Sequence, residues 1–163
     1  MNEFDLIVVG GGLAGYTAAR KGTERGARVL LVEKDAVGGR SRGYHALCRL
    51  SRAGVSPKVD GLQLIAAARK AGETLSARWT KWLEEAGVSV KYGAARLAGR
   101  GGVTVEGPEG VETMTGRGIL IATGSVPIAP TTLPFDGHQT IASDALPELD
   151  RVPASALVIG EER

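Results

Sequence analysis

The chain has 163 residues, a length that favours one domain or slightly more. Hydrophobic residues make up 43% of it and charged residues 23%, and the net charge of +2 is too small to favour binding to nucleic acid or an anionic membrane. The sequence has no run of about 18 apolar residues, so we predict no membrane span. Cys48 is the only cysteine, so no internal disulfide can form, and we expect a cytoplasmic protein.

The first third of the chain predicts a strand, a helix and a second strand. Residues 4–9 are an apolar run that stops at three glycines, which is typical of a buried parallel strand. Residues 13–25 are typical of a helix that ends at Gly26. Residues 28–32 form a second apolar run, closed by Glu33. Together these elements predict a right-handed crossover between two parallel strands.

The middle of the chain predicts more helix and a third strand. We expect a short helix over residues 45–53, a long helix over residues 60–86 and a parallel strand over residues 88–92. The long helix carries several large or apolar residues that we expect in the core. They are Leu62, Ile65, Ala66, Leu75, Trp79, Trp82 and Leu83.

After this point the pattern changes to short strands separated by glycine-rich turns. The segments expected to form an antiparallel meander are residues 95–98, 103–106 and 111–115. Residues 119–122 predict another buried strand, residues 126–134 a proline-rich loop, and residues 157–159 a last strand. The fold class predicted is α/β, a Rossmann-like parallel sheet with helices and a small antiparallel β-meander insertion at about residues 94–116.

The glycine cluster after the first strand matches the pattern G-x-G-x-x-G from Gly10 to Gly15. Gly10 permits the sharp turn from strand to helix, Gly12 lets the backbone approach a pyrophosphate, and Gly15 lets the helix pack close to the strand. Amides at the helix N-terminus and the helix dipole favour an anion there. The motif therefore predicts a dinucleotide site.

Glu33 follows Gly15 by 18 residues, near the spacing expected for a carboxylate that binds a ribose. A 2′-phosphate would be repelled by this carboxylate, which argues against NADP at the site. The motif alone leaves both FAD and NAD open, and a glycine-rich turn in an unrelated α/β protein is the plainer alternative.

Beyond this motif, the sequence resembles the pyridine nucleotide-disulfide oxidoreductases. The resemblance lies in residues 4–34, in the pair Gly38-Gly39, in residues 119–125 and in residues 143–160. It implies that the first glycine motif binds FAD. The cofactor-binding residues that we expect are Gly10, Gly12, Leu13, Ala14, Gly15, Glu33, Lys34, Gly38, Gly39, Arg40, Ser41, Ala95, Ala122, Thr123 and Gly124.

The chain departs from the family pattern where that pattern carries its redox chemistry. Ser41 and Ala46 occupy the two positions of the redox-active cysteines, and Leu50 the position of a lysine near the flavin. Thiol–disulfide exchange needs a thiolate and a disulfide, so we expect none here and assign no catalytic residue. Cys48 is displaced by two positions, and we expect it to be a small buried hydrophobe.

A second departure concerns the C-terminal end. The family's second glycine motif would begin at Gly160, three residues before the last residue. We therefore expect an incomplete FAD-binding domain at residues 1–150 and the start of an NAD(P)-binding domain at residues 151–163. One strand of the FAD sheet would be missing, which leaves an edge for a homodimer or a partner chain to cover. NAD(P)H would bind only through missing or separate domains.

The resulting hypothesis is the FAD-binding domain of a flavin-dependent NAD(P)H oxidoreductase that lacks the cysteine pair. A non-catalytic nucleotide-binding module or pseudoenzyme fragment and an NAD-binding Rossmann protein are the alternatives. His45 and His138 have no metal-ligand spacing, so we expect no metal.

Overall fold

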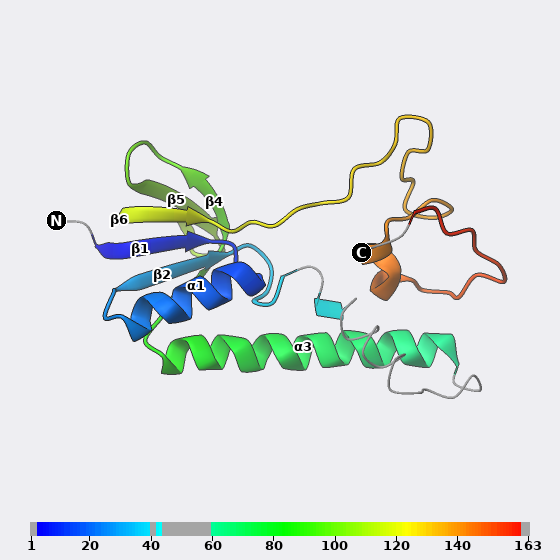
Figure 1. The fold of residues 1–163 in the computed structure, drawn as a ribbon, viewed down its shortest axis with the longest axis horizontal. Coiled ribbons are helices and arrows are strands. Elements are labelled where there is room, and N and C mark those ends of the chain that lie inside the picture. Colours follow the sequence, from blue (N-terminus) through cyan, green and yellow to red (C-terminus); the bar gives the residue numbers. More distant parts are fainter. Residues whose placement is uncertain (1–2, 40–41, 44–59, 161–163) are drawn as a thin grey trace.

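The computed structural model describes residues 3–39, 42–43 and 60–160 (Figure 1). It begins with strand β1 (Phe4–Val9), helix α1 (Leu13–Glu24) and strand β2 (Val29–Glu33), the predicted unit. Gly26, with φ of +81°, follows the end of α1. The predicted helix at residues 45–53 lies outside the described residues.

The strands form one six-stranded sheet in the order β3-β2-β1-β6-β5-β4. Strands β3 (Ser89–Tyr92), β2 and β1 run parallel. Strands β4 (Ala94–Leu97) and β5 (Gly102–Gly107) form the predicted meander with the first half of β6 (Gly110–Ile121). The predicted α/β fold with a Rossmann-like parallel sheet and an antiparallel meander is confirmed.

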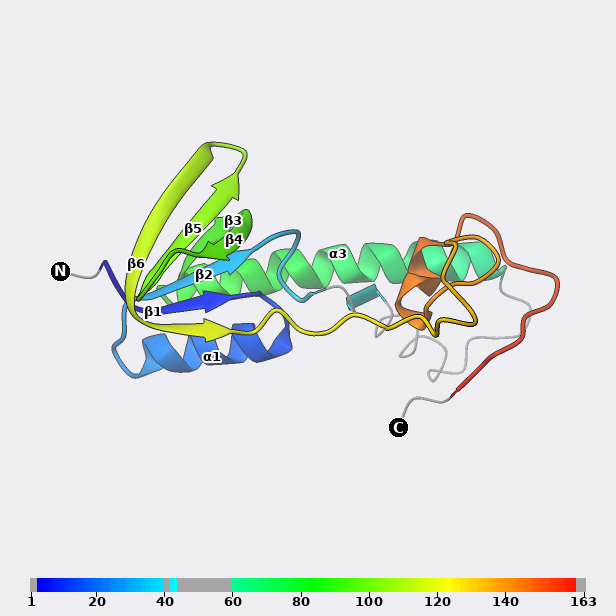
Figure 2. The same ribbon diagram turned by 90° about the horizontal axis from the view of Figure 1, so that it is seen from above.

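Strand β6 corrects one prediction. The sequence indicates two strands, at residues 111–115 and 119–122, but the structure has one continuous strand of 12 residues. Residues 110–115 pair antiparallel with β5, and residues 116–121 pair parallel with β1. A Cβ at Gly116 would lie 2.9 Å from Cγ1 of Ile7, so a glycine is needed where the strand crosses from one pairing to the other. Figure 2 shows the resulting bend of β6.

Helix α3 (Gly61–Glu85) begins at Asp60, whose side chain accepts a hydrogen bond from the backbone of Leu62 at 2.9 Å. Its packing differs from the prediction. Ile65 and Leu83 are buried, but Leu75 and Trp79 are only half-buried, and Leu62, Ala66 and Trp82 are exposed. The exposure of Leu62 and Ala66 has a geometric cause, because α3 extends well past the parallel strands and packs against the β-strands near its C-terminal end (Figure 1).

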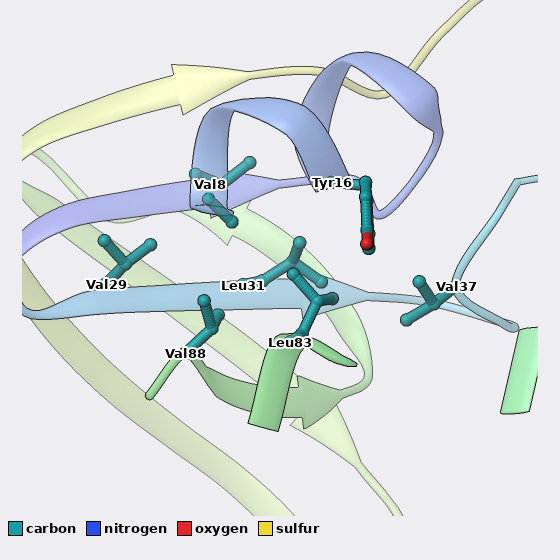
Figure 3. Packing of buried hydrophobic residues seen from close by; sticks show 8 residues of the cluster. Val8, Tyr16, Val29, Leu31, Val37, Leu83 and Val88 are labelled. Carbon is teal, nitrogen blue, oxygen red and sulfur yellow. The ribbon is translucent and has the colours of Figure 1, made fainter. Parts of the chain in front are cut away.

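The core consists of one hydrophobic cluster on each face of the parallel strands. Neighbouring residues in β1 point to opposite faces, so Val8 belongs to the first cluster and Ile7 to the second. The first cluster lies between the sheet and helices α1 and α3 (Figure 3), and includes Tyr16, Leu31 and Leu83. The second lies between β1, β2 and the meander strand β5. Both clusters hold β1 and β2 in the centre of the fold.

After β6 the described chain has little regular structure. Residues 126–134 form no helix or strand, as predicted, and the 3-10 helix η1 (Ser143–Glu148) follows. The strand predicted at residues 157–159 is not formed. These side chains remain 69–87% exposed, because no strand of the described part of the chain pairs with them. None of the described helices has the length and apolar composition needed to cross a bilayer.

Candidate nucleotide-binding site

The glycine motif lies in the turn between β1 and α1. Gly10 has a φ of +102°, and a Cβ there would lie 2.4 Å from the carbonyl oxygen of Ala122. A Cβ on Gly15 would lie 1.8 Å from the carbonyl oxygen of Gly10. Only glycine at these two positions allows α1 and the end of β6 to approach the turn so closely.

Helix α1 presents an uncapped N-terminus. Gly12 is its N-cap, with no side-chain hydrogen bond to the helix and no acidic residue in the first turn. No heavy atom lies within 4 Å of the position that a Cβ on Gly12 would occupy, and Leu13 and Ala14 are exposed. Backbone N–H groups at such an end have no partner within the helix, and the helix dipole adds partial positive charge. This end of α1 therefore suits a pyrophosphate.

Glu33 ends β2 beside this turn and is buried, with 9% of its surface exposed. Its Oε2 accepts a hydrogen bond from the backbone N–H of Gly11 at 2.5 Å, and its Oε1 accepts one from Asp35 at 2.9 Å. A carboxylate has about four acceptor positions, so two remain for other donors. Hydroxyl groups of a ribose are suitable donors, whereas a phosphate would meet a like charge.

The glycine pair folds onto the turn. Gly38 and Gly39 have φ of +104° and +73°, a conformation that favours glycine. The backbone N–H of Gly38 donates to the carbonyl oxygen of Gly11 at 2.8 Å. A Cβ on Gly39 would lie 3.3 Å from Cα of Gly12. The pair therefore lies beside the N-terminus of α1, and the predicted site residues Arg40 and Ser41 lie outside the described residues.

The end of β6 also lies at the glycine turn, and its residues complete the group that forms the candidate site. The backbone N–H of Ala122 donates to the carbonyl oxygen of Val9 at 2.7 Å, and Cα of Thr123 would lie 2.9 Å from a Cβ on Gly10. The structure thus gathers Gly10–Gly15, Glu33, Gly38, Gly39, Ala122 and Thr123 at the carboxyl ends of β1, β2 and β6. Ligands of open α/β sheets bind at this edge. Gly124 follows with φ of +74° and has open space around it.

A surface cavity of about 470 Å³ adjoins the group at the ends of β2 and β3. Its lining includes the predicted residue Lys34, together with Asp35, Tyr92, Gly93, Ala94, Glu106, Gly107 and Pro108. The predicted residue Ala95 is not part of this lining. It pairs with Val105 in the meander and packs against the second hydrophobic cluster.

Three residues of the site were not among those predicted: Gly11, Asp35 and Tyr92. Gly11 binds Glu33 and Gly38 through its backbone, a contact that no side-chain pattern reveals. Tyr92 could have been found, because it ends the third predicted parallel strand and the carboxyl ends of parallel strands share one edge.

The described histidine lies in a separate loop. The Asp136 carboxylate accepts hydrogen bonds from the backbone N–H groups of His138, Gln139 and Thr140 at 2.8–2.9 Å. These bonds, with that from Thr140 first, lower the pKa of Asp136 below the usual value. In the described ranges no group of three or more His, Cys, Asp or Glu residues is arranged to hold a metal ion.

Comparison with known proteins agrees with this architecture. The family model of pyridine nucleotide-disulphide oxidoreductases matches residues 4–161. The chain therefore belongs to the pyridine nucleotide-disulphide oxidoreductase family. It is similar to dihydrolipoyl dehydrogenase 2, chloroplastic, of Arabidopsis thaliana, with 32% identity over 97% of this chain and 31% of the relative. Dihydrolipoyl dehydrogenase of Chlorobaculum tepidum is also 32% identical, over 97% of this chain and 38% of the relative.

Solved structures show the same fold. LpdA from Mycobacterium tuberculosis superposes with a TM-score of 0.70 at 26% identity, over 91% of this chain and 38% of that one. The HOCl-induced flavoprotein disulfide reductase RclA from Escherichia coli gives a TM-score of 0.66 at 21% identity, over 78% of this chain and 29% of that one. The chain spans about a third of the length of these proteins.

Proposed function

We propose that the chain binds FAD at the edge formed by β1, β2 and β6, as the FAD-binding portion of a flavin-dependent NAD(P)H oxidoreductase. One observation carries the proposal. The N-terminus of α1 is uncapped and open at Gly12, and it lies beside the buried carboxylate of Glu33. An anion site next to a ribose acceptor is what the adenosine diphosphate half of FAD requires.

The residues divide into two groups by what they would contact. The N–H groups at Gly12, Leu13 and Ala14 would bind the pyrophosphate, and Glu33 would bind the ribose of the adenosine. Gly38, Gly39, Ala122 and Thr123 also pack on the turn and would border the remainder of the cofactor. Bound FAD supplies hydride and electron transfer, whereas the residues of this chain bind it and hold its orientation.

Two observations favour FAD over NAD. The glycine pair and the end of β6 both pack on the turn, and the resemblance in sequence ties both segments to FAD. Family membership supports the same cofactor. Glu33 disfavours NADP, because a 2′-phosphate would lie beside a buried carboxylate that already accepts two hydrogen bonds.

The route of the electrons would avoid a dithiol within the chain. Cys48 is the only cysteine, and Ser41 and Ala46 occupy the positions where the resemblance expects two. All three lie outside the described residues. The chain spans about a third of the length of its relatives, and the NAD(P)H site would lie in a separate domain. A different partner chain would supply that domain.

A second function has one observation in its favour. A chain with a single cysteine cannot form the internal dithiol, so a non-catalytic nucleotide-binding module is the alternative. The two functions differ in turnover. A flavin-loaded preparation of the purified chain with its partner domain would consume NAD(P)H with an added acceptor if it is the oxidoreductase, and would consume none if it is the module.

The binding proposal is tested by titration of the purified chain with FAD, NAD and NADP separately. We expect a flavin absorption spectrum to remain with the protein after free FAD is removed, and weaker binding of the other two. Tighter binding of NAD than of FAD would favour an NAD-binding Rossmann protein instead. A colourless protein that takes up no FAD would refute the proposal.

A matched pair of variants locates the site. Gly12→Val adds a branched side chain at the mouth of the proposed pyrophosphate site, where nothing lies within 4 Å. Gly118→Val adds the same side chain in β6, where the nearest atom lies 3.9 Å from a Cβ. We expect the first variant to lose FAD and the second to retain it. Equal affinities of the two variants would place FAD elsewhere.

A further inference from the structure

Helix α3 contacts the glycine pair through Trp79. Cε3 of the Trp79 ring lies 3.7 Å from the position that a Cβ on Gly38 would occupy. The side chain is half-buried and packs against the first hydrophobic cluster. Trp82, the second of the two tryptophans in the sequence, is exposed, and the Arg78 guanidinium lies 4.6 Å from the centre of its ring. Trp79 therefore joins α3 to the turn, whereas Trp82 lies at the surface.

A second ring fixes the orientation of Trp79. The Trp79 ring stacks on that of Tyr16 in α1, with 4.7 Å between the ring centroids and 28° between the planes. Tyr16 is buried in the first hydrophobic cluster together with Val37, the residue that precedes Gly38 (Figure 3). Stacked rings contribute stability beyond the area that they bury. The Trp79 ring therefore has defined contacts both with α1 and with the turn.

Helix α3 also contacts the residues that follow the glycine pair. Gly72 lies seven residues before Trp79, so the two residues share a face of α3. A Cβ on Gly72 would lie 3.4 Å from Cγ of Arg42 and from the backbone nitrogen of Gly43. The Arg42 guanidinium in turn donates a hydrogen bond to the carbonyl oxygen of Gly39 at 2.8 Å. One face of α3 therefore contacts this stretch of chain both at the glycine pair and beyond it.

The position of the glycine pair affects the N-terminus of α1. The backbone N–H of Gly38 donates to the carbonyl oxygen of Gly11 at 2.8 Å, as described above. A Cβ on Gly39 would lie 3.3 Å from Cα of Gly12, the N-cap of the helix. A displaced pair would lose the first contact and change the space around Gly12. Backbone groups that are already held in the binding geometry bind a ligand more tightly, because less ordering is needed.

We propose that Trp79 is a positioning residue for the nucleotide site. Its ring, stacked on Tyr16, holds the turn at Gly38 and Gly39 against the N-terminus of α1 and thereby raises the affinity for the nucleotide. The inference rests on the proposed function, because it takes this end of α1 as the pyrophosphate site. It gives α3 a part in binding that acts through the turn, and it assigns Trp79 no contact with the nucleotide itself.

The first measurement is amide hydrogen exchange followed by nuclear magnetic resonance, which needs no ligand. The backbone N–H of Gly38 donates to Gly11 at 2.8 Å. That of Gly10 donates to Val32 at the same distance, so Gly10 is a reference in the same turn. Local opening exposes one amide, whereas global unfolding exposes both. We expect Trp79→Ala to raise the exchange rate of Gly38 about tenfold relative to that of Gly10.

The second measurement is titration with FAD at a temperature at which every variant is folded. Trp79→Ala should bind FAD about tenfold more weakly than the unmodified chain, because the turn is no longer held in place. Trp79→Phe keeps an aromatic ring on Tyr16 and should bind FAD within about threefold of the unmodified chain. This recovery by a smaller ring separates the role of the stacked ring from the general effect of a changed core.

The matched control is Leu83→Ala. Leu83 is fully buried, and it belongs to α3 and to the same hydrophobic cluster (Figure 3). Its replacement leaves a cavity and lowers the stability of the whole fold. Because Leu83 lies four residues beyond Trp79 in the helix, the contact with the turn is retained. This variant should bind FAD normally and leave the ratio of the Gly38 and Gly10 exchange rates unchanged.

Two further readouts apply if Trp79→Ala does not fold. Trp79→Leu keeps a large apolar side chain but no ring, and it should show the same changes in exchange and in FAD affinity. The indole N–H signals of Trp79 and Trp82 give a readout on the unmodified chain. Inorganic pyrophosphate has no ring that could shift these signals directly. Its binding should shift the Trp79 signal and leave that of Trp82 in place, whereas equal shifts would contradict the inference.

The outcomes separate the inference from the proposed function. An unchanged exchange ratio in both Trp79→Ala and Trp79→Leu would overturn the inference, because the turn would not depend on the ring. A raised ratio with unchanged FAD affinity would overturn it too and leave the proposed function intact. An equal loss of FAD in Leu83→Ala would assign the effect to general stability, against the inference. If the unmodified chain binds no FAD, the proposed function is wrong, and the inference falls with it.

Discussion

A Cβ on Gly15 would lie 1.8 Å from the carbonyl oxygen of Gly10, so the first turn of α1 and the turn that follows β1 are in direct backbone contact. Neither side of this contact is a flexible side chain that could move away. The position therefore has a structural requirement for glycine that is independent of any ligand.

The first prediction concerns stability at this contact. Gly15→Ala should lower the free energy of unfolding by about 3 kcal/mol or more, because relief of the clash must displace backbone rather than a rotamer. Urea denaturation followed by circular dichroism measures the change. Gly118→Ala, whose added Cβ would make only ordinary van der Waals contact at 3.9 Å, is the control and should change stability by less than about 1 kcal/mol. Equal stabilities of the two variants would contradict the contact.

The second prediction concerns the Glu33 carboxylate, which accepts a hydrogen bond from the backbone of Gly11. Glu33→Gln keeps the shape of the side chain but removes the charge that strengthens the hydrogen bond from Gly11. We expect the free energy of unfolding to fall by about 2 kcal/mol, and the preference for FAD over nucleotides with a 2′-phosphate to fall with it. Thermal unfolding and nucleotide titration measure the two effects. An unchanged preference would mean that Glu33 does not face the ribose.

The third prediction concerns Tyr16, which stacks on Trp79 with 4.7 Å between the ring centroids. Its hydroxyl oxygen is buried without a hydrogen-bond partner of suitable geometry in the described residues, although the Arg20 side chain lies nearby. An unpaired buried hydroxyl costs about 1–3 kcal/mol, so Tyr16→Phe should leave stability unchanged or raise it. Tyr16→Ala should cost about 3 kcal/mol or more, since it removes the ring from the core. A Phe variant that melts well below the unmodified chain would reveal a hydrogen bond to this oxygen.

The fourth prediction is that low pH lowers the free energy of unfolding through Asp5, at the start of β1. The Asp5 carboxylate accepts a hydrogen bond from the backbone of Arg28 at 3.0 Å, and the Arg28 and Arg117 side chains lie 3.8 and 3.5 Å away. The backbone bond first, and then these cations, lower the pKa of Asp5. A carboxyl group with a lowered pKa stabilises the fold above its unfolded value of about 4 and loses that contribution as the pH falls through its folded value.

The measurement compares unfolding of the unmodified chain and of Asp5→Asn between pH 3 and pH 7. The unmodified chain should lose stability relative to the variant as the pH falls below about 4, and the difference should be largest near neutral pH. Two parallel curves would mean that Asp5 contributes nothing to the acid sensitivity.

Self-association is the fifth prediction. Residues 116–121 of β6 pair with β1 on one side, and no described strand pairs with their other side. Val158 and Ile159 are also 83% and 69% exposed. Unpaired strand edges and exposed apolar segments favour pairing with another chain. We expect sedimentation to show association that increases with concentration and decreases in Val158→Lys. A monomer at every concentration would exclude this.

Much of the fold could be predicted because local patterns determine it. Local sequence ends each of the first three elements. Glycines follow β1 and α1, and the charged residue Glu33 ends β2. The errors lie where distant contacts decide. Trp82 has the spacing of a core residue, yet it lies exposed with Arg78 above its ring at 4.6 Å. At Gly116, where the pairing of β6 changes from β5 to β1, a Cβ would lie 2.9 Å from Cγ1 of Ile7, a contact that no local pattern reveals.

In the candidate site, too, local patterns predict some residues, whereas contacts between distant segments determine others. Spacing predicted Gly10, Gly15 and Glu33 as candidate site residues, because each has a role that follows from its residue type, and the structure brings them together at one turn. The contact of Gly38 with Gly11 runs through the backbone, and the position of Tyr92 depends on the order of the strands. Neither has a signature that can be read from one segment.

The continuity of β6 also determines where the chain could be divided. A peptide bond broken between Gly107 and Gly110 would interrupt only the hairpin turn, and both fragments would keep a complete strand. A break at Gly116 would separate the half of β6 that pairs with β5 from the half that pairs with β1. The two fragments made by the first cut should therefore reassociate, which makes this hairpin the place to split the protein or to insert a reporter peptide.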